Sequence, residues 1–115
     1  MELPDRGLII RKEWLHEFFH NGKVWEMRST NTNMRGRIAL IEGGSGLVVG
    51  QCELVDSFEV TASEAASNFN KHRVADLSLL SKWRFAWVIE NVNPYETPVR
   101  YKHPKGAVIW VNLKK

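Results

Sequence analysis

Residues 36–60 place the strongest constraint on the fold, because they hold two long apolar β segments separated by a glycine turn. The first segment, GRIALIEGG, leads into GSG, which supplies residues able to take a positive φ. The second segment, LVVGQCELVDSFEV, contains Gly50, which marks a bend or bulge. The pattern predicts two strands joined by a tight turn.

The residues before this pair predict a strand, a helix and a second short strand. Residues 7–11 are a short β-branched run typical of a buried strand. Residues 12–22, KEWLHEFFHNG, place their large apolar side chains at i, i+1, i+4 and i+5, on one face of a helix that stops at Gly22. In residues 24–29 polar and apolar side chains alternate, which predicts a strand with Glu26 and Arg28 on one face.

A helix is predicted over residues 61–74, where Thr61 and Glu64 have the spacing of a capping box. A further helical turn is expected in residues 76–83, capped by Asp76 or Ser78.

The last two strands are expected at residues 84–92 and 106–113. The loop between them, residues 93–105, carries three prolines, which predict that it has no regular structure.

Together these elements predict an α+β fold: a small mixed β-barrel of five to six strands with two to three flanking helices. A length of 115 residues fits one domain, 1–115, and 43% hydrophobic residues suffice for a core. Cys52 is the only cysteine, which excludes an internal disulfide and favours a reducing, cytoplasmic setting. No apolar run is long enough to predict a membrane span.

The charges are unevenly distributed along the chain. Residues 41–70 carry five acidic residues and no lysine or arginine, whereas residues 71–115 carry nine basic residues against three acids. This asymmetry suits an anionic partner, and an ordinary solvated surface explains it equally well.

Lys23, Glu26 and Arg28 are the first candidate site residues. If their strand face lines a barrel or cleft, the three charges converge, and burial then requires that they pair. The alternative is an exposed pair on a surface strand, worth under about 1 kcal/mol.

Two further groups are candidates for RNA binding. Arg35 and Arg37 flank Gly36 and could hold phosphate, or they could form a basic turn that serves solubility. A later loop interleaves aromatic and cationic side chains, which suits base stacking and phosphate contact; its candidates are Tyr101, Lys102, His103 and Lys105. The alternative for that loop is a tyrosine lid over the core beside exposed lysines.

Other motifs carry little chemistry. His16 and His20 are spaced i, i+4 on the first helix, but no third ligand accompanies them, so no metal site is predicted. No cofactor is expected, and a divalent metal is left open. The glycine-rich turn joins two strands and does not lead into a helix, which argues against a phosphate-binding loop. Cys52 is interpreted as a core residue.

Residues 8–29, LIIRKEWLHEFFHNGKVWEMRS, resemble the start of ASCH domains, which belong to the PUA-like superfold. Gly22, Lys23, Glu26 and Arg28 correspond to the glycine, lysine, glutamate and arginine of the family signature. The resemblance continues through residues 35–56, FAWVIENV and YKHPKGAVIWVNL, and so spans nearly the whole chain.

The resemblance implies a barrel with a cleft for RNA or a nucleotide, and members of the family include ribonucleases and amidohydrolases of N4-acetylcytidine. The amidohydrolases use a lysine, which Lys23 matches, a threonine, whose position Glu26 occupies, and a later carboxylate, for which Glu64 and Asp76 are both candidates.

The leading hypothesis is therefore an RNA-binding protein that cleaves single-stranded RNA. Lys23 would stabilise negative charge, Glu26 would act as general base and arginines would hold phosphate. The alternatives are hydrolysis of an acylated nucleoside and a non-catalytic module that binds RNA or a modified nucleotide.

Overall fold

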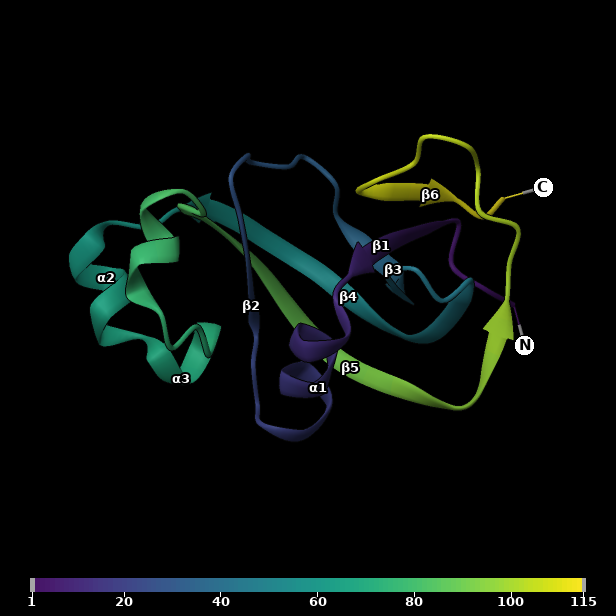
Figure 1. Cartoon of the computed structure of the whole chain (residues 1–115), viewed down its shortest axis with the longest axis horizontal. Helices are drawn as coiled ribbons and strands as arrows, with labels where there is room; N and C mark the ends of the chain where they lie inside the picture. The colour runs from purple at the N-terminus through teal and green to yellow at the C-terminus, as the bar shows by residue number, and fades with distance from the viewer. Residues whose placement is uncertain (1, 115) are drawn as a thin grey trace.

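The computed structural model describes residues 2–114, which form six strands, three α-helices and one 3₁₀ helix. In chain order the elements are β1 (Arg6–Ile10), α1 (Lys12–His20), β2 (Trp25–Arg28), β3 (Gly36–Glu42), β4 (Leu47–Glu59), α2 (Ala62–Ser67), α3 (Phe69–His72), η1 (Leu77–Ser81), β5 (Phe85–Arg100) and β6 (Trp110–Asn112). Figure 1 shows α2 and α3 at one end of the long axis and β6 toward the other. Within residues 2–114, no helix is long and apolar enough to cross a membrane.

The strands form one mixed sheet in the order β2-β5-β4-β3-β1-β6. β1 runs parallel to β3, and the other neighbours are antiparallel. The predicted α+β class with a six-stranded mixed sheet is confirmed, but the sheet is not closed into a barrel, because β2 and β6 do not pair. One side chain connects β2 to β1, the strand beside β6: Arg28 Nη2 donates to the carbonyl oxygen of Ile9 at 2.8 Å.

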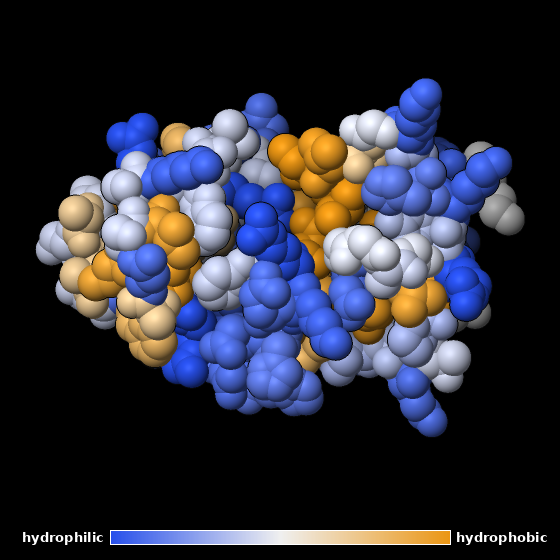
Figure 2. Space-filling model, in the orientation of Figure 1, coloured by the Kyte–Doolittle hydropathy of each residue, from blue (hydrophilic) through white to orange (hydrophobic). Residues whose placement is uncertain are grey.

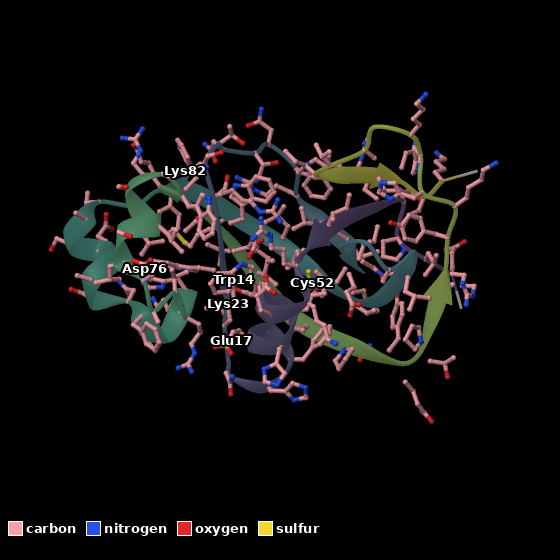
Figure 3. All side chains as sticks on the ribbon, in the orientation of Figure 1. Trp14, Glu17, Lys23, Cys52, Asp76 and Lys82 are labelled. Carbon is pink, nitrogen blue, oxygen red and sulfur yellow. The ribbon has the colours of Figure 1, made fainter. Side chains whose placement is uncertain are left out.

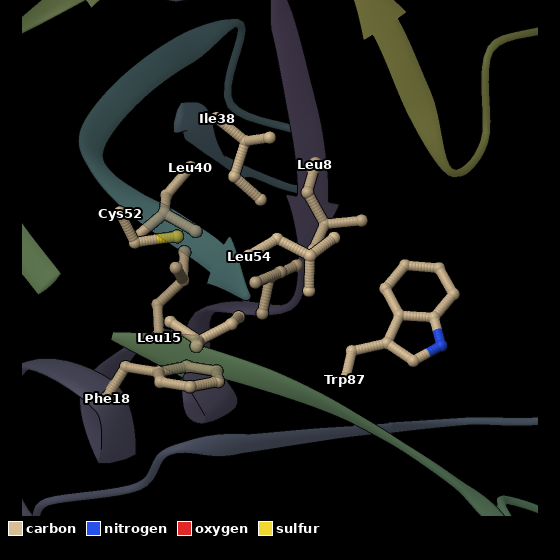
Figure 4. Close-up of a cluster of buried hydrophobic side chains, with 10 residues drawn as sticks. Leu8, Leu15, Phe18, Ile38, Leu40, Cys52, Leu54 and Trp87 are labelled. Atoms are coloured by element: carbon tan, nitrogen blue, oxygen red, sulfur yellow. The ribbon is translucent and has the colours of Figure 1, made fainter. Parts of the chain in front are cut away.

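Helix α1 covers the sheet with the apolar face that the sequence pattern predicts. Leu15 and Phe18 are buried and pack on side chains of β1, β3, β4 and β5 (Figure 4). This central cluster contains Leu8, Ile10, Leu15, Phe18, Ile38, Leu40, Cys52, Leu54, Trp87 and Ile89. The chain leaves the helix through Gly22, whose φ of 75° favours glycine.

A second cluster joins β2 and β5 to the helices after β4. Trp25 and Met27 of β2 and Ala86 of β5 pack there against Ala65 of α2 and Leu80 of η1. Because strand side chains alternate, the burial of Trp25 and Met27 on this side turns Glu26 to the opposite face of β2. The predicted alternation is therefore confirmed over Trp25–Arg28, whereas Val24, predicted to share the face of Glu26, packs against this second cluster.

The hairpin of β3 and β4 forms as predicted, with Gly44 and Gly46 at positive φ in its turn. The pairing register of β4 shifts at Gly50, against both β3 and β5. A Cβ atom at this position would lie 2.8 Å from the carbonyl oxygen of Asn93 in β5. Gly50 is thus the bend where two backbones approach closely.

The predicted loop at residues 93–105 is wrong over its first half, because β5 continues to Arg100 through Pro94 and Pro98. β2 pairs with β5 only as far as Val88, so among the described strands none pairs with that edge of the later part of β5. Pro94 also lies opposite Gly50, where the register already shifts. A missing backbone donor is tolerated at such an edge.

The predicted helix at residues 61–74 is two helices, because the backbone leaves helical geometry at Asn68. The capping box of Thr61 and Glu64 is confirmed. Asp76 caps η1, since its side chain accepts from the backbone N–H of Ser78.

Candidate functional site

Lys23 is a buried cation beside an aromatic wall. Its residue is 2% exposed, and its Nζ donates to the carbonyl oxygen of His72. The same nitrogen lies 5.0 Å from the ring centre of Trp14 and 5.3 Å from that of Phe18. Figure 3 shows Lys23 and Trp14 together near the middle of the molecule. One hydrogen bond and two ring faces therefore hold the ammonium group.

The carbonyl group that receives Lys23 is fixed from both sides. The backbone N–H of Val24 donates to the carbonyl oxygen of Lys71 at 2.9 Å, and Arg73 Nε donates to Glu17 Oε1 at 3.0 Å. Residues 71–73 are thereby tied to β2 and α1. Their contacts place the carbonyl of His72 at the end of the Lys23 side chain.

The His72 ring is fully buried and locks the same segment to α2. Its Nδ1 accepts from the backbone N–H of Val74 at 2.9 Å, so its Nε2 carries the proton and donates to the carbonyl oxygen of Ala65 at 2.7 Å. Burial lowers the pKa of His72, with Lys23 contributing in the same direction. Both effects favour the neutral ring that these contacts require.

Burial also lowers the pKa of Lys23, to about 8, because the charged amine is removed from water. The carboxylates of Glu26 and Glu17 oppose this shift. A lysine with this pKa can exchange a proton near neutral pH, as a general acid or base must.

Glu26 joins Lys23 to Arg28. Arg28 Nε donates to Glu26 Oε2 at 2.9 Å, and Arg28 Nη2 lies 2.8 Å from the same oxygen. The other carboxylate oxygen, Oε1, lies 4.0 Å from Lys23 Nζ. The guanidinium carbon of Arg28 lies 5.4 Å from the ring centre of Trp87. The three charges predicted to converge therefore form one buried or half-buried cluster.

This cluster lines a cavity of about 330 Å³ in the opening between β2 and β1. Its wall contains three tryptophans, two hydroxyl groups, three cations and one carboxylate. The lining residues are Ile9, Arg11, Trp14, Lys23, Glu26, Met27, Arg28, Ser29, Thr30, Gly43, Val74, Trp83, Trp87, Val108 and Ile109. Figure 2 shows hydrophobic surface bordering hydrophilic surface across the middle of this face. The cavity can hold a flat, partly apolar, anionic molecule.

Arg35 and Arg37 do not line this cavity. Arg35 donates to Ser57 Oγ at 3.0 Å and lies 3.9 Å from Asp56, on the outer surface of β4. Arg37 donates to Gln51 Oε1 at 3.0 Å. The two arginines are engaged with their own surface, and their binding of RNA stays a prediction.

The loop candidates at residues 101–105 also lie outside the cavity. Tyr101 packs against the cluster formed by Ala39, Ile41, Val48 and Val111. Its hydroxyl oxygen is 2.7 Å from Nδ1 of His103. Tyr101 therefore covers part of the core, while Lys102, His103 and Lys105 are exposed beside it. RNA contact by this loop stays a prediction.

Neither candidate for a later carboxylate reaches the cavity. Glu64 completes the capping box with Thr61, and that backbone contact lowers the pKa of Glu64. Asp76 accepts from Ser78 through both its backbone N–H and its hydroxyl group. Both carboxylates instead take part in the N-terminal caps of α2 and η1.

Several residues of the wall are not predicted from the sequence, among them Arg11, Trp14, Trp83 and Trp87. Trp14 was assigned to the core face of the helix, and it does pack there while one side faces the cavity. The five tryptophans of the chain were the available signal, but their spacing does not show which of them meet.

No metal centre is evident within residues 2–114, where no three His, Cys, Asp or Glu side chains are grouped to hold an ion. His16 and His20 lie with ring centres 4.6 Å apart on an exposed face of α1. Cys52 is buried as predicted, and burial raises the pKa of its thiol to about 12. This cysteine is therefore a packing residue.

No family model and no curated protein matches the sequence. Solved structures do match the fold. The crystal structure of ASCH from Zymomonas mobilis has a TM-score of 0.70 at 12% identity, over 96% of this chain and 87% of that one. A crystal structure of one mutant of that protein has a TM-score of 0.70 at 12% identity, over 96% and 90% of the two chains. Another mutant has a TM-score of 0.68 at 13% identity, over 98% and 92%. The sequence resemblance and these structures agree, and the chain has the fold of the ASCH domain.

Proposed function

We propose that the cavity binds a nucleotide of single-stranded RNA, with the base among the tryptophan rings and the phosphate at the cationic rim. The observation that carries this proposal is a cavity of about 330 Å³ whose wall joins three indole rings to a Lys–Glu–Arg cluster. Ligand sites begin at about 300 Å³. Unstacked bases are commonly held on aromatic side chains, beside cations that contact the backbone.

Arg11 is the best candidate for the phosphate contact. Lys23 uses one of its three donors on His72, and Arg28 uses Nε and Nη2 on Glu26 and Ile9. Arg11 lies exposed on the cavity wall, and its side chain makes no capping bond to α1. An arginine fork with free donors suits a phosphate group.

The same site supports cleavage of the bound RNA. In that reaction the 2′-hydroxyl oxygen attacks the adjacent phosphorus, the bond to the 5′ oxygen breaks, and a cyclic phosphate and a 5′-hydroxyl group form. A lysine with a pKa of about 8 is partly neutral at pH 7 to 8 and can take the 2′-hydroxyl proton. Its protonated form stabilises the charge that develops on phosphate oxygens, and the leaving 5′ oxygen takes its proton from this amine or from water.

Labelled single-stranded RNA tests cleavage. Lys23→Met keeps the unbranched side chain and removes the amine, so we expect cleavage to fall by about 10²- to 10⁴-fold. Lys71→Met is the matched control, since Lys71 also lies over a tryptophan ring, 5.2 Å from that of Trp25, but outside the cavity. Equal cleavage by the wild type and Lys23→Met would point to a contaminating nuclease, and parallel reactions with a chelator test the need for a divalent metal.

Tryptophan fluorescence tests binding by itself, because a base among the indole rings should quench their emission. An RNA oligonucleotide is titrated at rising salt concentrations, and we expect the affinity to fall with salt. Salt-sensitive binding without turnover would identify a non-catalytic module. An affinity that does not change with salt would rule out phosphate contact as the basis of binding.

A second candidate function is the hydrolysis of an acylated nucleoside such as N4-acetylcytidine. The observation that favours it is the presence of Ser29 and Thr30 on the same wall as Lys23, whose pKa is about 8. A hydroxyl group or a water activated by this amine could attack the amide. Chromatography should then show equal release of cytidine and acetate, and no release between pH 6 and 9 would exclude this activity.

A further inference from the structure

Within residues 2–114, Glu26 Oε1 accepts no hydrogen bond, although Glu26 is only 4% exposed. Both contacts from Arg28 go to the other oxygen, Oε2. The nearest cation to Oε1 is Lys23 Nζ at 4.0 Å, which is beyond hydrogen-bond distance. Both oxygens of a buried carboxylate normally accept hydrogen bonds, so Oε1 of Glu26 remains available as an acceptor.

The free oxygen must open toward the cavity. Among the described residues, every side-chain polar atom that is fully buried has a hydrogen-bond partner. Oε1 has none and is therefore not fully buried, and the cavity is the space that Glu26 lines. Lys23 is already bonded to His72, and the hydroxyl groups of Ser29 and Thr30 make no bond to Glu26. A donor on a ligand is the partner that this oxygen lacks.

The remaining wall restricts which ligand can bring that donor. Trp14, Trp83 and Trp87 favour a flat ring system. An ionised carboxylate can only accept hydrogen bonds, so it attracts an amino group and repels a carbonyl oxygen. Among flat rings found in nucleic acids, cytosine and adenine carry an exocyclic amino group where uracil and hypoxanthine carry a carbonyl oxygen.

We propose that Glu26 Oε1 accepts a hydrogen bond from the exocyclic amino group of a nucleobase, so that the cavity selects cytosine or adenine over the corresponding carbonyl-bearing base. This inference rests on the proposed function, in which the cavity holds a base. It makes Glu26 a residue that determines specificity, while Arg28 orients its carboxylate by occupying Oε2.

Cytidine monophosphate and uridine monophosphate test the proposal directly, because they differ only along one edge of the base: cytosine carries an amino group at C4 and an unprotonated N3, where uracil carries a carbonyl oxygen and an N3–H. We expect wild-type protein to bind the cytidine nucleotide about tenfold more tightly, as measured by quenching of tryptophan fluorescence. In Glu26→Gln the amide oxygen is required by Arg28, so the amide nitrogen faces the cavity and donates. This variant should lose or reverse the preference, while Glu13→Gln, an exposed change on α1 outside the cavity wall, should keep it.

The outcomes separate this inference from the proposed function. If neither nucleotide binds to the wild type, the proposed function fails and this inference fails with it. If both bind equally tightly, the cavity holds nucleotides without this selection, and only the inference is overturned. A preference that persists in Glu26→Gln would also overturn it, because another group must then read the base. If that variant does not fold by circular dichroism, adenosine and inosine monophosphates provide the second measurement on the wild type, where equal affinities overturn the inference.

Discussion

The buried amine of Lys23 should make the folded state more stable as the pH rises above neutrality. Burial lowers the pKa of Lys23 from its ordinary value of 10.5 to about 8. Between these two values the unfolded chain holds a proton that the folded chain has released. The free energy of unfolding must therefore increase with pH across this window, and below pH 8 the cost of burying the charge is present in full.

The size of the effect follows from the two pKa values. A shift of one pKa unit corresponds to about 1.4 kcal/mol. Between pH 7 and pH 9.5, proton release from Lys23 should raise the free energy of unfolding by about 2 kcal/mol. With a urea m-value of about 1 to 3 kcal/mol per molar, the midpoint of unfolding should rise by about 1 M.

Urea titrations of the wild type and Lys23→Met at pH 7, 8, 9 and 9.5 measure this effect. The variant lacks the amine, so the difference between the two pH profiles isolates Lys23 from other groups. The raised pKa values of Tyr95 and Tyr101, both caused by burial, act at higher pH and are shared by the two proteins. Lys71→Met, which removes an exposed amine, should follow the wild type.

Parallel pH profiles for the wild type and Lys23→Met would refute this reasoning. They would mean that Lys23 keeps the pKa of a solvated lysine and that the folded protein does not penalise its charge. A profile that falls with pH only in the wild type would be a stronger contradiction. It would require that the cluster with Glu26 stabilises the charged amine more than burial disfavours it.

Three further predictions concern the cavity, the bend in β4 and the core. Arg11→Ala should weaken nucleotide binding, and it should reduce by about one the slope of log affinity against log salt concentration for an oligonucleotide. Lys12→Ala, outside the cavity wall, should change this slope less. Equal effects of the two changes would show that only net charge matters. Gly50→Ala should lower the free energy of unfolding by about 1 to 3 kcal/mol, because its Cβ would lie 2.8 Å from a carbonyl oxygen of β5. Gly43→Ala, whose Cβ would lie 3.5 Å from its nearest neighbour, should lower the free energy of unfolding less in the same urea titration. Cys52 should not react with a thiol reagent at pH 8 unless urea unfolds the protein, since burial raises the pKa of its thiol to about 12; rapid reaction without urea would contradict its burial.

Much of the local structure could be predicted from the sequence. The apolar face of α1, the hairpin of β3 and β4 with its bend at Gly50, and the capping box of Thr61 and Glu64 all depend on periodicity or on residues a few positions apart. The resemblance to ASCH domains added the expectation of the overall fold, which the structural comparisons support.

Two predictions about regular structure failed because tertiary contacts override local preference. The prolines of residues 93–105 indicated a loop, but β5 extends through two of them along an edge that β2 does not cover. The helix at residues 61–74 divides at Asn68, after which His72 is buried between α2 and Lys23. A sequence pattern does not show which edge of a strand pairs with another strand, or that the helix must break so that the ring of His72 can be buried.

The candidate site shows the same division between local and distant effects. The alternation in residues 24–29 correctly places Glu26 and Arg28 on one face of β2, because side chains of a strand alternate whatever lies around them. Whether that face is idle or lines a cavity could not be decided from the pattern, since an exposed strand gives the same alternation.

The sequence by itself thus determined most of the elements and the face on which Glu26 and Arg28 lie, because both follow from backbone geometry over a few residues. Only the tertiary structure decided that Lys23 is buried against His72, which is distant in the sequence, and that Arg11, Trp83 and Trp87 share its cavity. These contacts exist because α1, α3 and the open edge of the sheet pack around one space. Burial lowers the pKa of Lys23, and this burial arises only when the elements pack together.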